Sequence, residues 1–381
     1  MSKRAFFAAV ACVLVLPALV AVAAARSAAP PAAVGPSPVG ARYATTMRPL
    51  RGIDFVNATT GWAVGANGVI IRSVTAGTLW TRQRSVVSSS SVFSDVCFVD
   101  ELHGWAVGSG VILHTIDGGQ TWTKQIKPTP KPLWAVEFVD ATHGWAVGGE
   151  PDDRPESVHQ PTYVLLRTVD GGITWTNVME GEGCVYFDVE FVDRDRGWIV
   201  GQVRDQIDDM DGRTVACVLS STDGGHTWSE PASEAFGLAN DGVSALQAVD
   251  FRTGLLGWAV GSLGQGSGRR GLVVRTTDGG STWTLTLSQR FSAFTDVSFP
   301  STGVGYAVGL GVAGDATARL VVKTVDGGAT WARQLLPARL AWSPAVDFVS
   351  AARGWIAADT AAHRGVVLRT VNGGASWVRV R

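Results

Sequence analysis

The residues of this chain whose types and spacing could do chemistry are aspartates in a recurring octapeptide. Six copies read T-x-D-G-G-x-T-W or a close variant, at residues 115–122, 168–175, 221–228, 276–283, 324–331 and 370–377, and a worn first copy occupies 73–80. A carboxylate beside two glycines could bind calcium or transfer a proton. It could instead accept hydrogen bonds from backbone N–H groups of its own turn, with the glycines supplying positive φ and the tryptophan burying apolar area.

We favour the second, structural interpretation of this octapeptide. The predicted structural residues are Asp117, Asp170, Asp223, Asp278, Asp326 and Asn372, together with Trp80, Trp122, Trp175, Trp228, Trp283, Trp331 and Trp377.

Other combinations that could carry chemistry are weaker. The six histidines show no metal-ligand spacing, and residues 205–212 resemble a calcium loop but lack the spacing and the closing glutamate of an EF-hand. A sialidase would need an arginine triad, an activated Tyr–Glu pair and an Arg-Ile-Pro segment, and this last segment is absent. We therefore predict no catalytic residue, no metal site and no cofactor.

The elements that must position these residues are short strands. Gly-Trp recurs at 61–62, 104–105, 144–145, 197–198, 257–258 and 354–355, with Gly-Tyr at 305–306, and each pair precedes one octapeptide. In the third repeat we expect strands at 134–139, 145–149 and 163–168 and a fourth from Trp175. Seven such repeats predict an all-β, seven-bladed β-propeller with four antiparallel strands per blade, which closes without strand exchange.

The octapeptide resembles the Asp-box, or BNR repeat, of sialidases, sortilin-type receptors and other propellers. The whole unit, V-x-F-V-D-x-x-x-G-W-A-V-G followed by T-x-D-G-G-x-T-W, resembles the photosystem II assembly and stability factor family over residues 50–381. That resemblance implies a seven-bladed propeller exported to a lumen or periplasm.

One column of the innermost strands is acidic. Aligning the repeats places Asp54, Cys97, Glu137, Glu190, Asp250, Ser298 and Asp347 at one position, and the first strand of a blade lines the central channel. These side chains could bind a cation or a polar ligand. We favour local hydrogen bonds or hydration in the channel.

Charge is unevenly distributed along the chain. Residues 137–211 hold 17 acidic residues against five arginines, whereas 40–92 and 339–381 each hold six arginines against one and two aspartates. Such asymmetry would orient a partner. Insertions at 149–161, 201–214, 261–270 and 309–318 should share one face, so we expect a partner surface there, with Arg269, Arg270, Asp208 and Asp209 as candidates.

Two of the 15 tryptophans, Trp134 and Trp342, lie outside the repeat motifs. With Phe93, Tyr186, Phe187 and Phe294 they fall where the chain reaches an innermost strand, and together they could form an aromatic collar that binds a partner. The alternative, which we favour, is that each ring packs between neighbouring blades.

The first 40 residues carry targeting signals rather than a core. Residues 1–25 combine Lys3 and Arg4 with an uncharged apolar run ending in A-x-A, which indicates a signal peptide or an uncleaved membrane anchor. Residues 26–40 form an Ala/Pro-rich linker, and 41–381 the propeller. Either alternative places the folded part outside the cytoplasm: periplasmic, lumenal or at the cell surface. We expect Cys97, Cys184 and Cys217 to be free thiols.

Composition narrows the function. A hydrophobic content of 46% excludes wholesale disorder, and a net charge of −1 excludes a globally basic nucleic-acid binder. The leading interpretation is a non-enzymatic propeller that binds a protein partner, with a membrane complex as one candidate. A carbohydrate- or cell-wall-binding propeller is the alternative, and a sialidase-like hydrolase is third.

Overall fold

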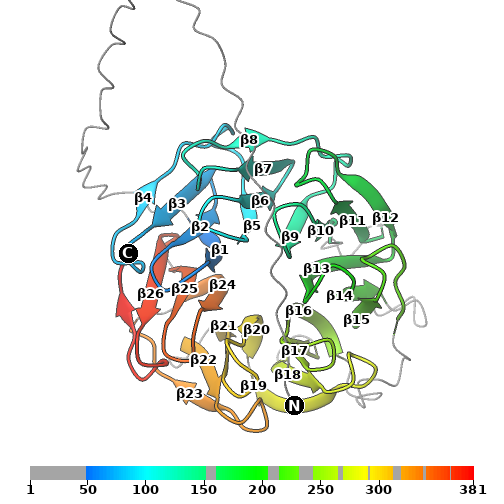
Figure 1. Cartoon of the computed structure of the whole chain (residues 1–381). Helices are drawn as coiled ribbons and strands as arrows, with labels where there is room; N and C mark the ends of the chain where they lie inside the picture. Colours follow the sequence, from blue (N-terminus) through cyan, green and yellow to red (C-terminus); the bar gives the residue numbers. More distant parts are fainter. Residues whose placement is uncertain are drawn as a thin grey trace, which may run out of the picture. The chain divides into compact units, whose positions relative to one another are not determined.

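The computed structural model of the chain describes residues 49–151, 160–204, 214–230, 243–264, 269–290, 292–311, 319–337, 340–360 and 362–381. These residues form 27 strands, and no helix among them could cross a membrane. The strands group into seven antiparallel sheets arranged as blades around a central axis (Figure 1).

The first three blades each contain four strands. Blade 1 consists of β1 (Leu50–Phe55), β2 (Gly61–Gly65), β3 (Val69–Ser73) and β4 (Thr81–Arg82). Blade 2 consists of β5 (Phe93–Phe98), β6 (Gly104–Gly108), β7 (Val111–Thr115) and β8 (Thr123–Lys124). Blade 3 consists of β9 (Leu133–Phe138), β10 (Gly144–Gly148), β11 (Thr162–Thr168) and β12 (Thr176–Glu182).

The remaining blades follow the same order. Blade 4 consists of β13 (Cys184–Phe191), β14 (Gly197–Arg204) and β15 (Thr214–Ser221). Blade 5 consists of β16 (Val243–Phe251), β17 (Gly257–Leu263), β18 (Arg270–Thr276) and β19 (Thr284–Arg290). Blade 6 consists of β20 (Ser292–Ser298), β21 (Gly305–Gly311), β22 (Arg319–Thr324) and β23 (Ala332–Gln334), and blade 7 of β24 (Ala341–Phe348), β25 (Gly354–Asp359), β26 (Gly365–Thr370) and β27 (Val378–Arg379).

The predicted all-β, seven-bladed fold is confirmed. In blade 3, the observed strand ends differ from the expected ones by no more than one residue. In the described part, blade 4 shows three strands, followed by a single bridge between Ser220 and Ser229 after its Asp-box. One expectation needs correction: the insertions predicted at 201–214, 261–270 and 309–318 are partly strand, since β14, for example, continues to Arg204, whereas none of the described strands enters 149–161.

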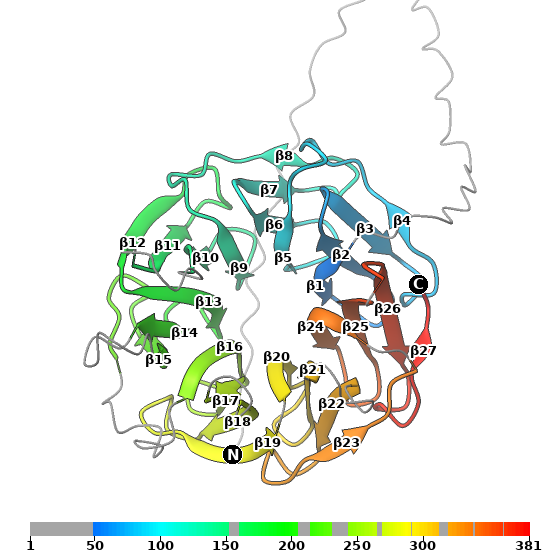
Figure 2. The same cartoon turned by 180° about the vertical axis from the view of Figure 1, so that it is seen from behind.

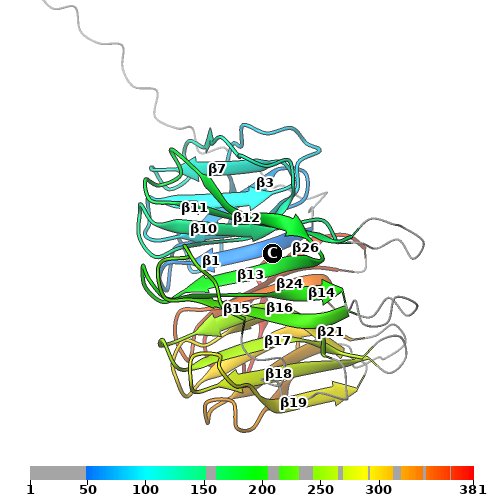
Figure 3. The same cartoon turned by 90° about the vertical axis from the view of Figure 1, so that its right-hand side faces the viewer.

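The two faces of the ring carry different turns (Figure 3). The first and third turns of every blade lie at the same end of its antiparallel strands, and backbone hydrogen bonds link them: Gly171 N–H donates to Thr142 O at 2.9 Å. We call this the box face, because the third turn is the Asp-box. The opposite face, with the second turns and the connections between blades, is the insertion face.

Packing between blades explains the recurring Gly-Trp. The second strand of a blade is buried along its whole length, because it lies between two neighbouring sheets. The glycine is needed for a close approach: a Cβ on Gly104 would lie 2.3 Å from the ring of Phe98. The tryptophan that follows fills the space toward the next blade and is completely buried in blades 1, 2 and 3.

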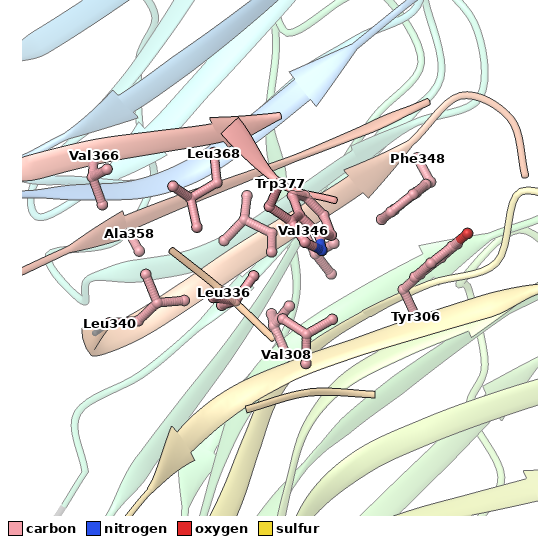
Figure 4. Close-up of a cluster of buried hydrophobic side chains, with 12 residues drawn as sticks. Tyr306, Val308, Leu336, Leu340, Val346, Phe348, Ala358, Val366, Leu368 and Trp377 are labelled. Carbon is pink, nitrogen blue, oxygen red and sulfur yellow. The ribbon is translucent and has the colours of Figure 1, made fainter. Parts of the chain in front are cut away.

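Every junction between blades repeats one aromatic unit. The ring after the recurring glycine stacks on a phenylalanine of the next blade, with 3.5 Å between ring centroids, in the pairs Trp62–Phe98, Trp105–Phe138, Trp145–Phe191, Trp198–Phe251, Trp258–Phe299, Tyr306–Phe348 and Trp355–Phe55. That phenylalanine meets the Asp-box tryptophan of its own blade edge-on, as Phe348 meets Trp377 at 5.9 Å. Figure 4 shows this cluster between blades 6 and 7.

Polar atoms of these rings also bridge the blades. The indole N–H of Trp145 donates to Gly224 O in the Asp-box of blade 4 at 3.0 Å. Six of the seven junctions repeat this bond to a box carbonyl, while Tyr306 donates its hydroxyl to Ala351 O at 2.8 Å. Burying the rings therefore leaves few donors without a partner.

Blade 7 lies beside blade 1 and closes the ring (Figures 1 and 2), and the same side-chain unit joins them. Trp355 of β25 stacks on Phe55 of β1, and its indole N–H donates to Ala76 O at 3.0 Å. Each of these two blades is built from consecutive strands, so closure needs no strand exchange. In the described part, Cys97, Cys184 and Cys217 are free thiols.

Candidate functional site

The Asp-box carboxylates act on their own turns. Asp170 accepts hydrogen bonds from Thr168 Oγ1 at 2.8 Å, from Thr174 N–H at 2.9 Å and from Thr174 Oγ1 at 2.6 Å. Although burial raises the pKa of Asp170, these hydrogen bonds lower it below its ordinary value. Asn372 replaces the carboxylate with an amide oxygen and accepts the same backbone bond, from Ser376 N–H at 2.9 Å. The geometry therefore gives the carboxylate a role within the turn.

Cations lie beside the boxes on the box face. Six of the seven third strands carry one at the same position: Arg72, His114, Arg167, Arg275, Lys323 and Arg369, all half-buried. We call this set the cation ring. The sequence shows the column, but it does not show the environment of these side chains, which depends on the neighbouring blade.

The side chains of the cation ring contact aromatic rings or the Asp-box of the next blade. The Arg72 guanidinium carbon lies 5.2 Å from the centroid of the Trp62 ring. The Arg167 Nε–H donates to Gly224 O at 2.8 Å, and Lys323 Nζ donates to Gly373 O at 2.9 Å. These contacts hold the head groups of Arg72, Arg167 and Lys323 in place on the box face.

His114 is the uncharged member of the cation ring near neutral pH. Its ring stacks on Trp105, with 4.7 Å between centroids. Burial, followed by the nearby His103, lowers the pKa of His114 to about 4. The permanent charge of the ring therefore comes from four arginines and one lysine.

The central channel encloses a cavity of about 290 Å³ lined by carboxylates. The predicted column supplies five of them: Asp54, Glu137, Glu190, Asp250 and Asp347. A second column, missed in the sequence, supplies Asp95, Asp188 and Asp296. These three lie two residues before the predicted column, so strand alternation gives both columns the same side of the strand.

Most of these carboxylates bind the backbone of the next blade. Asp54 Oδ2 accepts from Phe98 N–H at 2.5 Å, and Asp347 Oδ2 accepts from Phe55 N–H at 2.8 Å, which joins blade 7 to blade 1. Four more bonds of this kind come from Asp95, Asp188, Asp250 and Asp296, at 2.6 to 3.0 Å. The carboxylates thus connect the innermost strands.

Glu137 and Glu190, on adjacent blades 3 and 4, have no such backbone bond among the described residues. Glu137 accepts only the Cys97 thiol, at 3.8 Å. Burial and then repulsion from Asp54 raise the pKa of Glu137, while burial and then repulsion from Glu137 raise that of Glu190.

The pKa values of the channel carboxylates are raised, which favours their protonated, uncharged form. Burial raises the pKa of Asp95 and Asp250 to about 6, and that of Asp188 and Asp347 to about 7. Within the described residues, no group of three or more His, Cys, Asp or Glu side chains is placed to hold a metal ion. We therefore interpret the two columns as connections between blades, formed by buried carboxylates that repel one another.

The predicted aromatic collar is wrong for three of its six members, and Phe187 is half-buried. Phe93 and Phe294 are completely buried, and Tyr186 is 5% exposed. They pack inside the clusters between blades, as the alternative interpretation expected. Trp134 is half-buried and its indole N–H donates to Gly149 O at 2.8 Å. The side chain of Trp342 lies outside the described ones.

The predicted charged residues of the insertion face are described only in part. Arg269 and Arg270 are exposed, and Arg269 Nη2 donates to Ser262 Oγ at 3.0 Å. Asp208 and Asp209 lie outside the described residues. The structure does not bring these four residues together, so they remain candidates from the sequence.

Comparison with known proteins identifies the same repeat family as the sequence motifs. Residues 43–131 and 83–183 match the family model described as photosynthesis system II assembly factor YCF48, which confirms the resemblance drawn from the motifs. The solved structure of YCF48 bound to D1 peptide is 18% identical, with a TM-score of 0.60 over 86% of this chain and 94% of that one. YCF48 from Cyanidioschyzon merolae is also 18% identical, with a TM-score of 0.58 over 85% and 96%.

The likeness in fold extends to proteins of other kinds. The WD40 β-propeller domain of Doa1 is 11% identical, with a TM-score of 0.53 over 88% of this chain and 93% of that one. No curated protein sequence matches the chain. The structural likenesses therefore establish a propeller, and the matched repeat points to the YCF48 type.

Proposed function

We propose that this protein is an exported, non-enzymatic propeller that binds a segment of a protein partner, in the manner of a photosystem II assembly factor. The observation that carries the proposal is the match of residues 43–183 to the YCF48 repeat. A related solved structure is that of YCF48 bound to D1 peptide.

The geometry supports binding over catalysis. The Asp-box carboxylates are engaged by their own turns, and six channel carboxylates are engaged by the next blade. A general acid or base must be free to exchange a proton with a substrate. Of the described channel acids, only Glu137 and Glu190 lack a backbone bond, and neither faces a nucleophile other than the Cys97 thiol, whose pKa burial raises.

The cation ring is the surface that best fits an acidic partner segment. Arg72 is held over the Trp62 ring and Arg167 against a box carbonyl, so binding a carboxylate costs little further ordering of these two side chains. The Nε atoms of Arg275 and Arg369 have no hydrogen-bond partner among the described residues. The contacts are spread over six blades, so an extended segment could reach several of them at once. Arg269 and Arg270 on the insertion face are the competing candidates.

A glycan ligand has less support. Sugar-binding sites commonly offer an exposed aromatic ring as a stacking platform, and the exposed large apolar side chains in the described part are all aliphatic. The carbohydrate-binding alternative therefore lacks its characteristic surface among the described side chains.

Export is proposed from the N-terminal sequence. The apolar run of residues 5–25 and its A-x-A ending support a secretory signal, with an anchor as the alternative. Expression in a bacterial host followed by intact-mass measurement distinguishes them: a cleaved signal removes about the first 25 residues, and an anchor leaves the full chain in the membrane fraction. A full-length chain in the cytosol would contradict export.

Titration calorimetry with the D1 peptide as probe tests the binding proposal. We expect the unmodified propeller to bind the peptide, and Arg167→Gln with Arg275→Gln to weaken binding by about tenfold or more, since each charged hydrogen bond contributes about 1.5–3 kcal/mol. Arg167→Lys with Arg275→Lys is the matched control, because it keeps the charge.

The outcome also separates the two faces. If the glutamine pair binds the probe as tightly as the unmodified chain while Arg269→Gln with Arg270→Gln does not, the partner surface lies on the insertion face. If no variant and no unmodified chain binds the probe, the proposed function is wrong for this class of partner.

A further inference from the structure

Charge is unevenly distributed around the box face. We define the seam patch as residues 56–60 and 72–82 of blade 1 with 349–353 and 369–379 of blade 7, which form the first turn, the Asp-box and its flanking strand residues of each blade. The patch holds five arginines and no acidic residue: Arg72, Arg82, Arg353, Arg369 and Arg379. Nine acidic residues stand against four lysines and arginines in the equivalent segments of blades 2, 3 and 4, which are 99–103, 114–124, 139–143, 167–177, 192–196 and 220–230.

The seam patch lacks acidic residues in part because both of its Asp-boxes have lost the carboxylate. Asn372 occupies the position in blade 7 and Thr75 the position in blade 1. Each still serves its own turn: Asn372 Oδ1 accepts from Ser376 N–H at 2.9 Å, and Thr75 Oγ1 accepts from Leu79 N–H at 2.9 Å. The turn is kept in both blades, and only the negative charge is gone.

No described acidic side chain neutralises the arginines of the seam patch. In the described part, their guanidinium groups form no ion pair with Asp or Glu and one hydrogen bond, from Arg379 Nε to Arg381 O at 2.9 Å. In the acidic blades, by contrast, Arg194 lies 2.7 Å from Asp140. Arg82 and Arg353 are exposed to solvent. The positive charge of the patch is therefore available to an anionic partner.

Aliphatic side chains lie among these arginines. Val74 and Val371, at the second position of their boxes, are 57% and 52% exposed, and Leu79 is 69% exposed. Because blades are repeated around one axis, equivalent turns reach about the same height on the box face (Figure 3). The seam patch is thus a flat surface that mixes cationic and aliphatic groups.

We propose that the seam patch docks the propeller on a lipid bilayer that contains anionic headgroups. The arginines attract the lipid phosphates, and the aliphatic side chains enter the headgroup layer. A protein hot spot needs anchors clustered in a packed pocket, whereas fluid lipid can surround separate side chains at the tips of turns. The same anionic surface repels blades 2 to 4, so the ring contacts the bilayer at blades 7 and 1. This inference goes beyond the proposed function and does not depend on it.

The probes are vesicles of phosphatidylcholine alone and vesicles of phosphatidylcholine with an equal part of phosphatidylglycerol. Co-sedimentation of the full chain should show binding to the anionic vesicles about tenfold tighter or more, because each arginine near such a surface is attracted to it. Added salt should weaken that preference, because it screens exposed charges.

An uncleaved N-terminal anchor would attach the chain to both kinds of vesicle, so a second measurement locates the contact. Hydrogen exchange resolved by residue compares the two vesicle samples. In the anionic sample, the turns at 73–80 and 370–377 should exchange about threefold more slowly or more, and the turn at 221–228 of blade 4 should be unchanged.

One pair of substitutions removes charge from the seam patch. Arg82→Gln with Arg353→Gln should reduce the preference for anionic vesicles by about tenfold or more and remove the protection of both turns. Lys124→Gln with Arg196→Gln is the matched control, because it removes two positive charges from the equivalent strand and turn positions of blades 2 and 4. The control pair should keep both the preference and the protection.

A second pair tests the aliphatic side chains. Leu79→Thr with Val371→Thr introduces the residue that the same box positions carry at Thr121 and Thr277, so the turns should fold unchanged. Binding to anionic vesicles should weaken by about tenfold, because less apolar area enters the headgroup layer.

The proposal is overturned if the chain shows neither preference for anionic vesicles nor protection of the two turns, if both charge pairs lose binding equally, or if the threonine pair binds as the unmodified chain does. D1 peptide binding that depends on Arg167 and Arg275, without any vesicle preference, would overturn this proposal and leave the proposed function standing. Vesicle docking without peptide binding would do the reverse.

Discussion

At the residue scale, the aspartate of each Asp-box is a local acceptor. Asp170 bonds to a backbone N–H and two hydroxyl groups within its own turn, so its charge is satisfied before any ligand arrives. The same contacts made by Asn372 show that an oxygen at this position matters more than a negative charge.

Asp170→Ala should lower the free energy of unfolding by about 1 kcal/mol, because an exposed turn loses its acceptor and water replaces part of it. Asp170→Asn is the matched control and should be close to the unmodified chain. Urea denaturation followed by tryptophan fluorescence measures both. If D1 peptide binding were lost in Asp170→Ala with unchanged stability, the structural role of the box would be refuted.

At the element scale, the blades are joined by aromatic stacking. Trp355 of β25 contributes both a flat contact with Phe55 and a hydrogen bond to Ala76 O at the junction where the ring closes. The two contributions can be separated by substitution, because phenylalanine retains the stack and loses the donor.

Trp355→Ala should destabilise the protein by about 3–5 kcal/mol, the usual cost of removing a large buried aromatic ring. Trp355→Phe should cost about 1 kcal/mol, for one lost hydrogen bond. Thermal and guanidinium unfolding measure the two variants side by side. Equal losses in both would mean that the hydrogen bond, and not the stacking, holds the junction.

The sequence predicted features that depend on neighbouring residues in the chain better than features that depend on contacts between blades. The Gly-Trp and octapeptide repeats located the strands of blade 3 to within about one residue, because both motifs are turn signals. The acidic column at Asp54 was also visible, and alternation would have revealed the column at Asp95 two residues earlier. The partners of both columns could not be predicted, because a carboxylate that reaches the backbone of the next blade depends on tertiary packing.

At the scale of the whole molecule, two sets of carboxylates oppose each other in their response to pH. The channel acids have a raised pKa, so the folded state holds protons that the unfolded chain has lost, and stability falls as pH rises through their values. The box aspartates have a lowered pKa, so their contribution is lost as pH falls below the unfolded value.

Stability should therefore be greatest between about pH 4 and 5 and should decline toward about pH 7, the range set by the unfolded carboxyl value and by the channel acids. Melting temperature measured at constant ionic strength from acid to neutral pH checks this. Asp188→Asn keeps an acceptor for Val249 N–H and removes a charge, so it should flatten the decline. Asp170→Asn should leave the decline unchanged. A melting temperature that rises steadily from pH 4 to 7 would contradict the assignment.

Because the ring closes through the same contacts that join its other blades, the position of the chain ends around the ring is not fixed by packing. Blade 7 meets blade 1 through the same stacked pair, box carbonyl and carboxylate that join other neighbours, so the packing gives no blade a privileged first place. A circular permutant that begins between two other blades, with the present ends joined by a short flexible linker, would retain every one of these contacts. The contacts between blades thus do not depend on which pair of blades the chain ends lie between.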